Sequence, residues 1–471
     1  MGIGFNVGTG NADDVKEGIK AGRALLAEGD AAADKGDTAE AVVRYKRAFE
    51  KLLPGMRKIP FKTEVKRDVT AREELKNVLI KEIDDEMTPG EFRAGEMGMK
   101  ALGFFPKEFK LKEVMVKVYS EEIAAFYDTK TKTMHLIKEA EAKDKKPLTF
   151  LERLMGKSQG FDKDENKTVI AHELTHALAD QNFDIDSMQK KIKHDDDRDL
   201  ALSALIEGEA TLTMLGAQQS DWEGDDISRM PAASLDRIFG FMIPLMPMFG
   251  GKSLREAPVI LSESLIFPYF RGLVFCAKLT NDGGWEALNK AYKSPPLSTE
   301  QILHPEKYTT DPDAPTAVDL GKLDAGPQWK ELGRNVVGEM QLGVLLRRHG
   351  GKKAAAGWDG DQFAVFEGSQ GKLGLVWFST WDSAPDAREF QEGYVKFQTT
   401  KMGKDLPQPE AYPEAIRRPH DGVIYAVERK GADVVVVEGF NADLTDALVT
   451  RAFGAFKNQK MQFPESKEAA K

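Results

Sequence analysis

The chain has 471 residues, of which 41% are hydrophobic and 30% are charged, and it carries a net charge of −10. This length and composition predict a globular protein of two or three domains, and the acidic balance without a basic face excludes nucleic acid as the expected partner. The single cysteine, Cys276, excludes both an internal disulfide framework and a zinc site built from several cysteines. Any metal must therefore be held by histidines and carboxylates.

The sequence as written carries no targeting or membrane signal. Residues 1–10 are rich in glycine and lack a basic start followed by an apolar core, which predicts a cytoplasmic protein, or an exported one if a signal peptide was trimmed. The most apolar stretch, residues 238–249, is interrupted by Pro244 and Pro247. It is shorter than the roughly 20 residues that cross a bilayer, so we expect no transmembrane segment.

Residues 15–53 predict a helical hairpin, which gives a first domain over residues 1–58. Apolar residues recur at helical spacing, Gly36 and Asp37 mark the turn, and Asp37 with Glu40 suits a helix cap. Residues 27–54 resemble one tetratricopeptide unit. Because one such unit cannot bury its own apolar face, we expect the hairpin to pack on the rest of the chain, and it could also bind a protein partner.

A mainly helical domain is predicted over residues 59–325. Its expected helices span residues 69–85, 91–102, 168–179, 197–216 and much of 253–292. From Val114 the apolar period shifts towards two, and residues 123–127 and 133–137 predict a β-hairpin.

The remaining residues, 326–471, predict a smaller α/β or α+β module. Residues 373–380, 422–429 and 434–440 have the pattern of strands, and residues 386–399 and 444–456 that of helices. The whole chain is thus expected to be an α+β protein with a small β-sheet in its helical domain. No motif in this module carries chemistry.

The chemistry is concentrated in an H-E-x-x-H motif, His172 to His176, on a helical stretch. Helix geometry places residues four apart on one face, so both imidazoles can reach one ion, while Glu173 can address water on that ion. The helix is uncharged around the motif, which favours a buried site over a chance match. Two imidazoles with a third protein ligand and a water are the ligands of a catalytic Zn²⁺.

A third ligand is expected from the helix over residues 197–216, which offers Glu207 and Glu209. Glu207 shares its helix face with small residues, which allow a second helix to approach closely, whereas Glu209 lies among large apolar residues. We therefore favour Glu207 as the ligand and Glu209 as a partner of a ligand histidine, with Glu209 as the alternative ligand. Asp180, one turn beyond His176, could orient an imidazole or simply end the helix.

The motif together with the downstream Glu-Gly-x-Ala of residues 207–210 resembles the gluzincin clan, which includes thermolysin and the zinc aminopeptidases. Further stretches, residues 125–128, 172–184, 204–211, 298–308 and 355–361, resemble a little-characterised group of prokaryotic H-E-x-x-H proteins. The resemblance implies a zincin-like metallopeptidase domain in which Glu207 completes the site. It also implies a His or Tyr opposite the metal-bound water, for which His304 and Tyr269 are the candidates, and an edge strand in the 123–137 hairpin for an extended peptide.

The expected function is therefore zinc-dependent hydrolysis of peptide bonds in a protein or peptide substrate, with Glu173 as general base. The alternative is a non-catalytic zinc-containing scaffold that binds partners through the N-terminal hairpin and the C-terminal module. A carboxylate such as Glu173 beside the metal favours the peptidase.

Overall fold

The computed structural model describes residues 12–123, 125–138, 162–217, 231–242, 252–403, 406 and 409–462. The helices are α1 (Ala12–Asp34), α2 (Thr38–Arg57), α3 (Arg72–Glu86), α4 (Pro89–Leu102), α5 (Leu111–Glu122), α7 (Lys163–Phe183), α8 (Ile185–Lys191), α9 (Asp196–Ala217), α10 (Ala232–Met242), α11 (Lys252–Glu256), α12 (Val259–Lys293), α13 (Thr299–Leu303), α14 (Gly338–Leu345), α15 (Lys352–Ala355), α16 (Ala384–Met402) and α17 (Ala442–Ala452). The strands are β1 (Lys66–Ala71), β2 (Ala125–Asp128), β3 (Thr133–Lys138), β4 (Thr316–Asp319), β5 (Lys330–Asn335), β6 (Trp358–Glu367), β7 (Leu373–Trp381), β8 (Ala415–His420), β9 (Val423–Lys430), β10 (Asp433–Phe440) and β11 (Phe456–Lys460).

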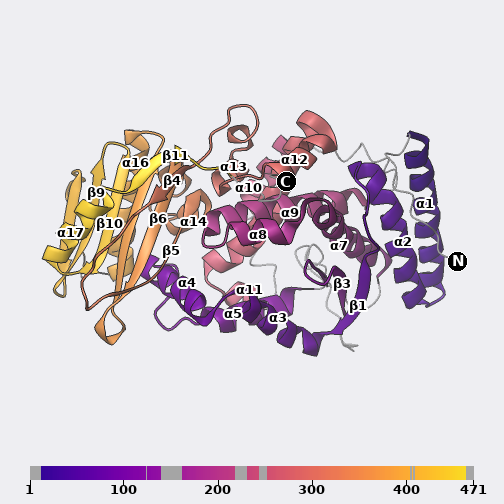
Figure 1. The fold of residues 1–471 in the computed structure, drawn as a ribbon, viewed down its shortest axis with the longest axis horizontal. Coiled ribbons are helices and arrows are strands. Elements are labelled where there is room, and N and C mark those ends of the chain that lie inside the picture. Colours follow the sequence, from indigo (N-terminus) through magenta and orange to yellow (C-terminus); the bar gives the residue numbers. More distant parts are fainter. Residues whose placement is uncertain are drawn as a thin grey trace, which may run out of the picture.

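The molecule is elongated and has the expected α+β class (Figure 1). The hairpin of α1 and α2 lies at one end, the helices around α7, α9 and α12 fill the middle, and the six-stranded sheet forms the other end. The helix α4 packs on β5, β6 and β7 of that sheet, although it precedes the central helices in the sequence. The boundaries at residues 58 and 325 stay predictions.

The predicted N-terminal hairpin is present, and its turn follows from two residues. Gly36 has a positive φ of 81°, and the Asp37 side chain accepts a hydrogen bond of 3.1 Å from the Glu40 amide, which caps α2. The two helices pack closely because Gly22 and Gly29 of α1 leave room for side chains of α2. The buried face of α2 then packs on α7.

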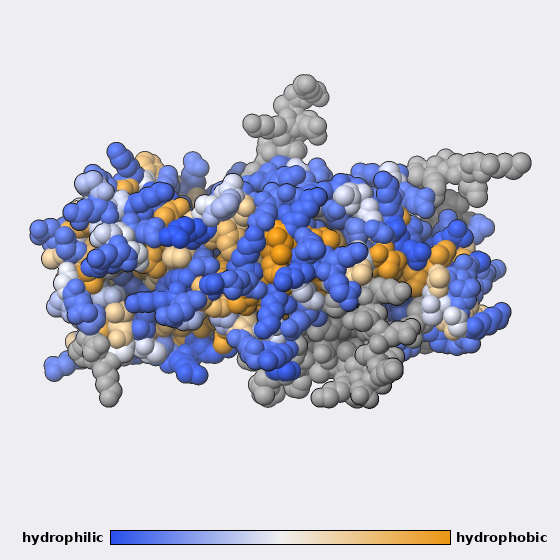
Figure 2. Space-filling view, turned by 90° about the horizontal axis from the view of Figure 1, so that it is seen from below, coloured by the Kyte–Doolittle hydropathy of each residue, from blue (hydrophilic) through white to orange (hydrophobic). Residues whose placement is uncertain are grey.

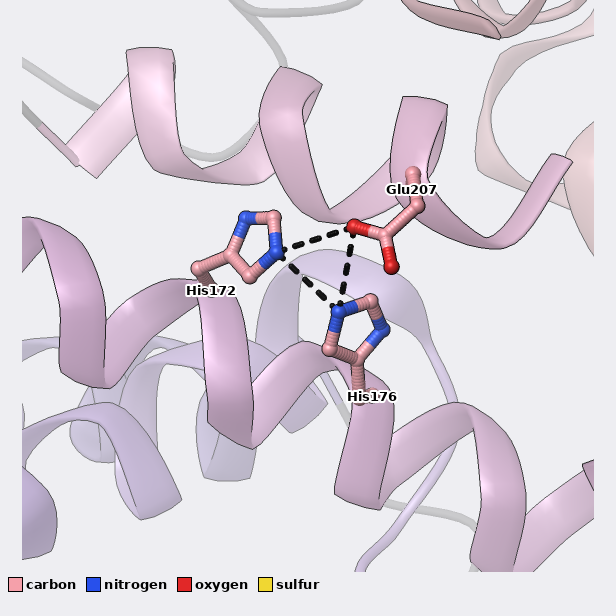
Figure 3. Close-up of side chains that lie close together, drawn as sticks. All are labelled: His172, His176 and Glu207. Atoms are coloured by element: carbon pink, nitrogen blue, oxygen red, sulfur yellow. Dashed lines mark hydrogen bonds and ion pairs between the residues drawn. The ribbon is translucent and has the colours of Figure 1, made fainter. Parts of the chain in front are cut away.

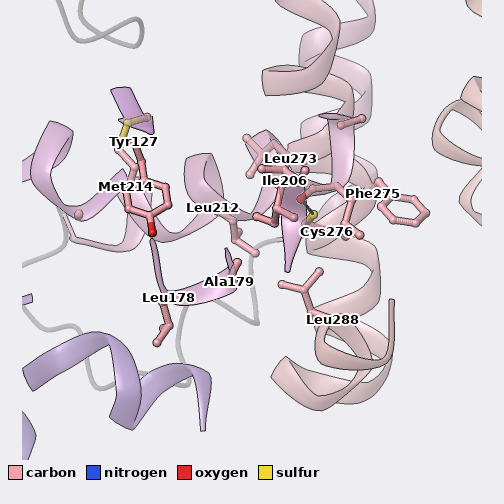
Figure 4. Packing of buried hydrophobic residues seen from close by; sticks show 14 of the residues in the cluster. Tyr127, Leu178, Ala179, Ile206, Leu212, Met214, Leu273, Phe275, Cys276 and Leu288 are labelled. Carbon is pink, nitrogen blue, oxygen red and sulfur yellow. Dashed lines mark hydrogen bonds between the residues drawn. The ribbon is translucent and has the colours of Figure 1, made fainter. Parts of the chain in front are cut away.

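The core of the middle region lies between α7, α9 and α12. Their apolar side chains interdigitate there, among them Leu178, Leu212 and Leu273 (Figure 4). The backbones of α9 and α12 touch, since a Cβ atom placed on Gly272 would lie 2.0 Å from the Ala204 carbonyl oxygen. Gly208 occupies the same crossing, where its Cβ would lie 2.1 Å from the Gly272 carbonyl carbon.

This crossing makes Gly272→Ala a strongly destabilising change. The added methyl group would force α9 and α12 apart, and overpacking of this kind costs about 1–3 kcal/mol. Gly343→Ala in α14 is the matched control, because nothing lies within 4 Å of its Cβ position and alanine is the better helix former by about 0.5–1 kcal/mol. Urea unfolding should show a lower free energy of unfolding for Gly272→Ala and no loss for Gly343→Ala. Equal stability of the two variants would contradict the tight crossing.

A three-stranded sheet of order β1-β3-β2 lies beside α7. The predicted hairpin is confirmed, since β2 and β3 pair antiparallel. The expected helix from residue 69 is wrong at its start, because residues 69–71 belong to β1, which pairs in parallel with β3. The period-two pattern from Val114 also misled, since that segment forms α5. Packing of α5 on α3 and α11 overrides the strand propensity of its valines.

The C-terminal sheet has the order β5-β6-β7-β10-β9-β8, with a separate core on each face. Along β6, Phe363 and Val365 enter one core while Ala364 and Phe366 enter the other. The predicted strands correspond to β7, β9 and β10, but β5, β6 and β8 were not predicted. The helix expected over residues 444–456 ends at Ala452, and β11 begins at Phe456.

Within the described residues, one helix is long and apolar enough to cross a membrane, namely α12. Of its most apolar 18-residue window, 72% is buried in the fold, which is typical of the core helix of a soluble protein. The face in Figure 2 is mainly hydrophilic, with hydrophobic residues in small groups scattered along its length. Most of the apolar stretch noted above, residues 243–249, lies outside the described residues, as do residues 1–10.

Candidate metal centre

The helix α7 presents the H-E-x-x-H motif in its buried middle. It begins after Asp162, whose side chain accepts hydrogen bonds from the amides of Asp164 and Glu165, and it ends at Asp184, which has a positive φ. The helix is thus about one turn longer at each end than predicted. His172 and Glu173 are 8% and 6% exposed, respectively.

Two histidines and one glutamate converge on a single point (Figure 3). His172 Nε2 lies 3.1 Å from Glu207 Oε2 and 3.0 Å from His176 Nε2. His176 Nε2 lies 3.4 Å from the same Glu207 oxygen. In the described part of the chain, this is the only group of His, Cys, Asp or Glu side chains arranged to hold a metal ion.

Electrostatics in the cluster bind its members together. Burial disfavours a charge on His176, but the neighbouring Glu207 carboxylate outweighs this and raises the His176 pKa to about 9. Burial likewise disfavours the charged form of Glu207, yet the two imidazoles hold its pKa well below the usual range. The same carboxylate and imidazoles could hold a metal cation, which would displace the proton from the imidazole.

Glu173 follows His172 on the helix and does not join the convergent atoms. Burial raises the pKa of its carboxyl, although the two histidines partly offset this. Its Oε2 atom is buried and has no hydrogen-bond partner. The backbone of Tyr127 in β2 lies close enough to favour the ionised carboxylate, so the edge strand borders this residue directly. A buried carboxyl with a raised pKa is suited to accept and return a proton.

The structure brings Glu207, and not Glu209, to the imidazoles. The Glu209 carboxylate instead pairs with the Arg57 guanidinium at the end of α2, and both side chains are almost fully buried. The expectation that Glu209 serves a ligand histidine is thus replaced by a different contact. A buried carboxylate in apolar surroundings needs a partner of opposite charge, and Arg57 of the N-terminal helical hairpin is that partner.

Asp180 also has other partners than the expected imidazole. Its Oδ2 atom accepts hydrogen bonds of 3.0 Å from the Tyr127 hydroxyl and 2.7 Å from Lys132 Nζ. Both donors belong to the hairpin region of β2 and β3. Through these hydrogen bonds, Asp180 links the β2–β3 hairpin to α7 at a point one turn beyond His176.

The resemblance implied a Tyr or His opposite a metal-bound water, and the two candidate residues lie in different places. The ring of Tyr269 on α12 stacks on His172 at 6.1 Å between centroids, and burial together with Glu207 raises its pKa well above the usual value. His304, in contrast, lies outside the cluster and contacts Glu339 of α14 at 3.0 Å. Burial and the carboxylates Glu339, Glu300 and Glu306 act on His304, where the hydrogen bond to Glu339 dominates and raises its pKa.

Sequence reasoning missed Arg57, Tyr127 and Lys132. Tyr127 lay within a predicted strand, but nothing in that strand indicated a contact with α7. For Arg57 there was one signal. It is a basic residue at the end of an amphipathic helix, and it lies on the same side as the apolar residues that point inwards. Its partner lies 152 positions away, so no local pattern could identify it.

Comparison with known proteins gives a match only for the C-terminal module. No curated protein and no solved structure matches the chain. A family model described as a domain of unknown function (DUF8575) matches residues 327–449. This segment contains all six strands of the C-terminal sheet and none of His172, His176 and Glu207.

Proposed function

We propose that the protein is a zinc-dependent metallopeptidase of gluzincin type, with His172, His176 and Glu207 as metal ligands. The observation that carries this proposal is the spacing of the three donor atoms. Ligands at about 2.0–2.1 Å from a tetrahedral zinc lie about 3.3 Å from one another. The three separations here are 3.1, 3.0 and 3.4 Å. Two nitrogens and one oxygen are also the donor set that zinc accepts in catalytic sites.

The chemistry then divides between the ion and the chain. Bound zinc would polarise a carbonyl group and lower the pKa of its water towards about 7. Glu173 would take the proton of the attacking water and return it to the leaving amine. Of the two candidates for stabilising the developing oxyanion, Tyr269 is supported by its position beside His172, and His304 is not. The edge strand β2, next to Glu173, could hold an extended peptide by strand addition.

The alternative, a zinc-containing scaffold without catalysis, has less support. Such a site would need no buried carboxyl with a raised pKa beside the ligands, and it would fill its fourth position with a protein group. A fourth ligand does not accompany the three donors within the described residues. The proposal also includes a protein or peptide substrate and a protein partner that binds the N-terminal hairpin.

Metal content tests the proposal directly. The wild-type protein, loaded with zinc and dialysed, should retain about one ion per chain. His172→Ala and His176→Ala should each abolish retention, because each removes one of three protein ligands. His135→Ala is the control, since His135 lies in β3 beside Thr70 and outside the cluster. Stoichiometric zinc in both single variants of the motif would reject the assignment.

A further inference from the structure

A buried ion pair joins the N-terminal hairpin to the helix that carries Glu207. The Arg57 side chain is 0% exposed and that of Glu209 is 1% exposed. The Arg57 guanidinium also lies 4.9 Å over the Trp285 ring of α12, and its Nη1 atom is 3.5 Å from the Trp285 carbonyl oxygen. A buried pair of this kind contributes little stability relative to apolar residues of the same volume, because both charges lose their hydration. Stability alone therefore does not account for it.

Glu209 belongs to a short segment of α9, residues 207–209, in which each residue contacts a different part of the protein. Successive residues of an α-helix are about 100° apart, so Glu207 and Glu209 point to nearly opposite sides of α9. Glu207 faces the two imidazoles of α7, and Glu209 faces Arg57. Between them, Gly208 lies against the backbone of α12 at Gly272. The three contacts lie on different sides of α9, so together they oppose its rotation about its axis.

Glu209 also belongs to the electrostatic surroundings of the site. Its carboxylate is close enough to His176 for the two charges to interact. Without Arg57, a second uncompensated carboxylate would be buried behind the cluster, which is unfavourable unless the group takes up a proton or α9 turns to bring it to water. Any such turn moves Glu207 away from His172 and His176.

We propose that Arg57 is a positioning residue of the metal centre, which holds Glu207 in place through its ion pair with Glu209. This inference rests on the proposed zinc site. It makes the N-terminal hairpin part of that site, because Arg57 is the last residue of α2.

The test compares zinc affinity with stability in the full-length chain. Arg57→Met should raise the Kd for zinc, measured by competition with a chromophoric chelator, by about 10–100-fold, the range typical of groups that support metal ligands. The double variant Arg57→Met/Glu209→Met removes the stranded charge and should recover stability in urea unfolding. Its zinc affinity should nevertheless stay about tenfold or more below that of the wild type, because α9 has lost its rotational anchor.

Lys401→Met is the matched control. Lys401 Nζ pairs with the buried Glu438 at 2.6 Å in the C-terminal module, so its loss should lower stability and leave the Kd for zinc unchanged. A double variant with wild-type stability and wild-type Kd would overturn the inference while the zinc site stands. Failure of the wild-type protein to bind zinc would reject the proposed function itself. The chelator competition measures wild-type binding as well, so it distinguishes this outcome from the failure of the inference about Arg57.

Discussion

Glu173→Gln is expected to retain one zinc per chain and to lose nearly all peptide hydrolysis. The amide has the size of the carboxylate but cannot accept a proton from the attacking water, and general-base catalysis contributes about 10²–10⁴-fold in rate. Zinc should stay bound, because Glu173 is not among the three convergent donors. Casein cleavage and metal content, measured on the same preparation, report the two effects separately.

A second buried glutamate provides the control for this substitution. Burial raises the Glu300 pKa to about 8, although Lys307 partly offsets it, and Glu300 lies near Glu339 and away from the motif. Glu300→Gln should therefore preserve the turnover per bound zinc. Cleavage by Glu173→Gln within a few-fold of wild type would assign the base to another residue or the activity to another site.

The parts of the site that sequence reasoning located are those set by local geometry. His172 and His176 are four positions apart on one helix, so their common face follows from the helical repeat alone. Glu207 could be singled out because its neighbours on the helical wheel are small. The close approach in the structure is, however, largely between α9 and α12, at Ala204, Gly208 and Gly272, and of these only Ala204 shares the helix face of Glu207. The helical-wheel argument thus selected the residue that the structure brings to the imidazoles, but for a partly different reason.

The parts that escaped depend on contacts between distant segments. The preference for Glu209 as a partner of a histidine failed because a sequence cannot show that Arg57 lies against it. Asp180 follows His176 by one turn, which left open whether it orients an imidazole or ends the helix. In the structure it accepts hydrogen bonds from Tyr127 and Lys132 of the β2–β3 hairpin. The strand β6 was missed for a related reason. Both of its faces are covered, so its sequence lacks the alternation of a half-exposed strand.

Glu207→Ala should weaken zinc binding more than any change in the groups around the ligands. It removes the only charged ligand and leaves two neutral imidazoles, whereas the loss of a supporting contact typically costs about 10–100-fold in affinity. Glu209→Gln serves as the neighbouring control. This variant should keep one zinc per chain at ordinary concentrations, and its loss of zinc affinity should fall within that range of about 10–100-fold. The reason is that the Glu209 carboxylate contacts Arg57 and not the imidazoles.

Crystals of the zinc-loaded protein give the decisive geometry for this pair of glutamates. A Glu207 oxygen should lie at about 2.0–2.2 Å from zinc, with one coordination position left to water. If Glu209 made that contact, α9 would have to turn by more than a third of a revolution, which would break the Arg57 pair and the Gly208 crossing together. The peptidase proposal would survive such a result, but the positioning role of Arg57 would not. If neither carboxylate approached the metal, the gluzincin resemblance itself would fail, because that resemblance requires a glutamate from this helix.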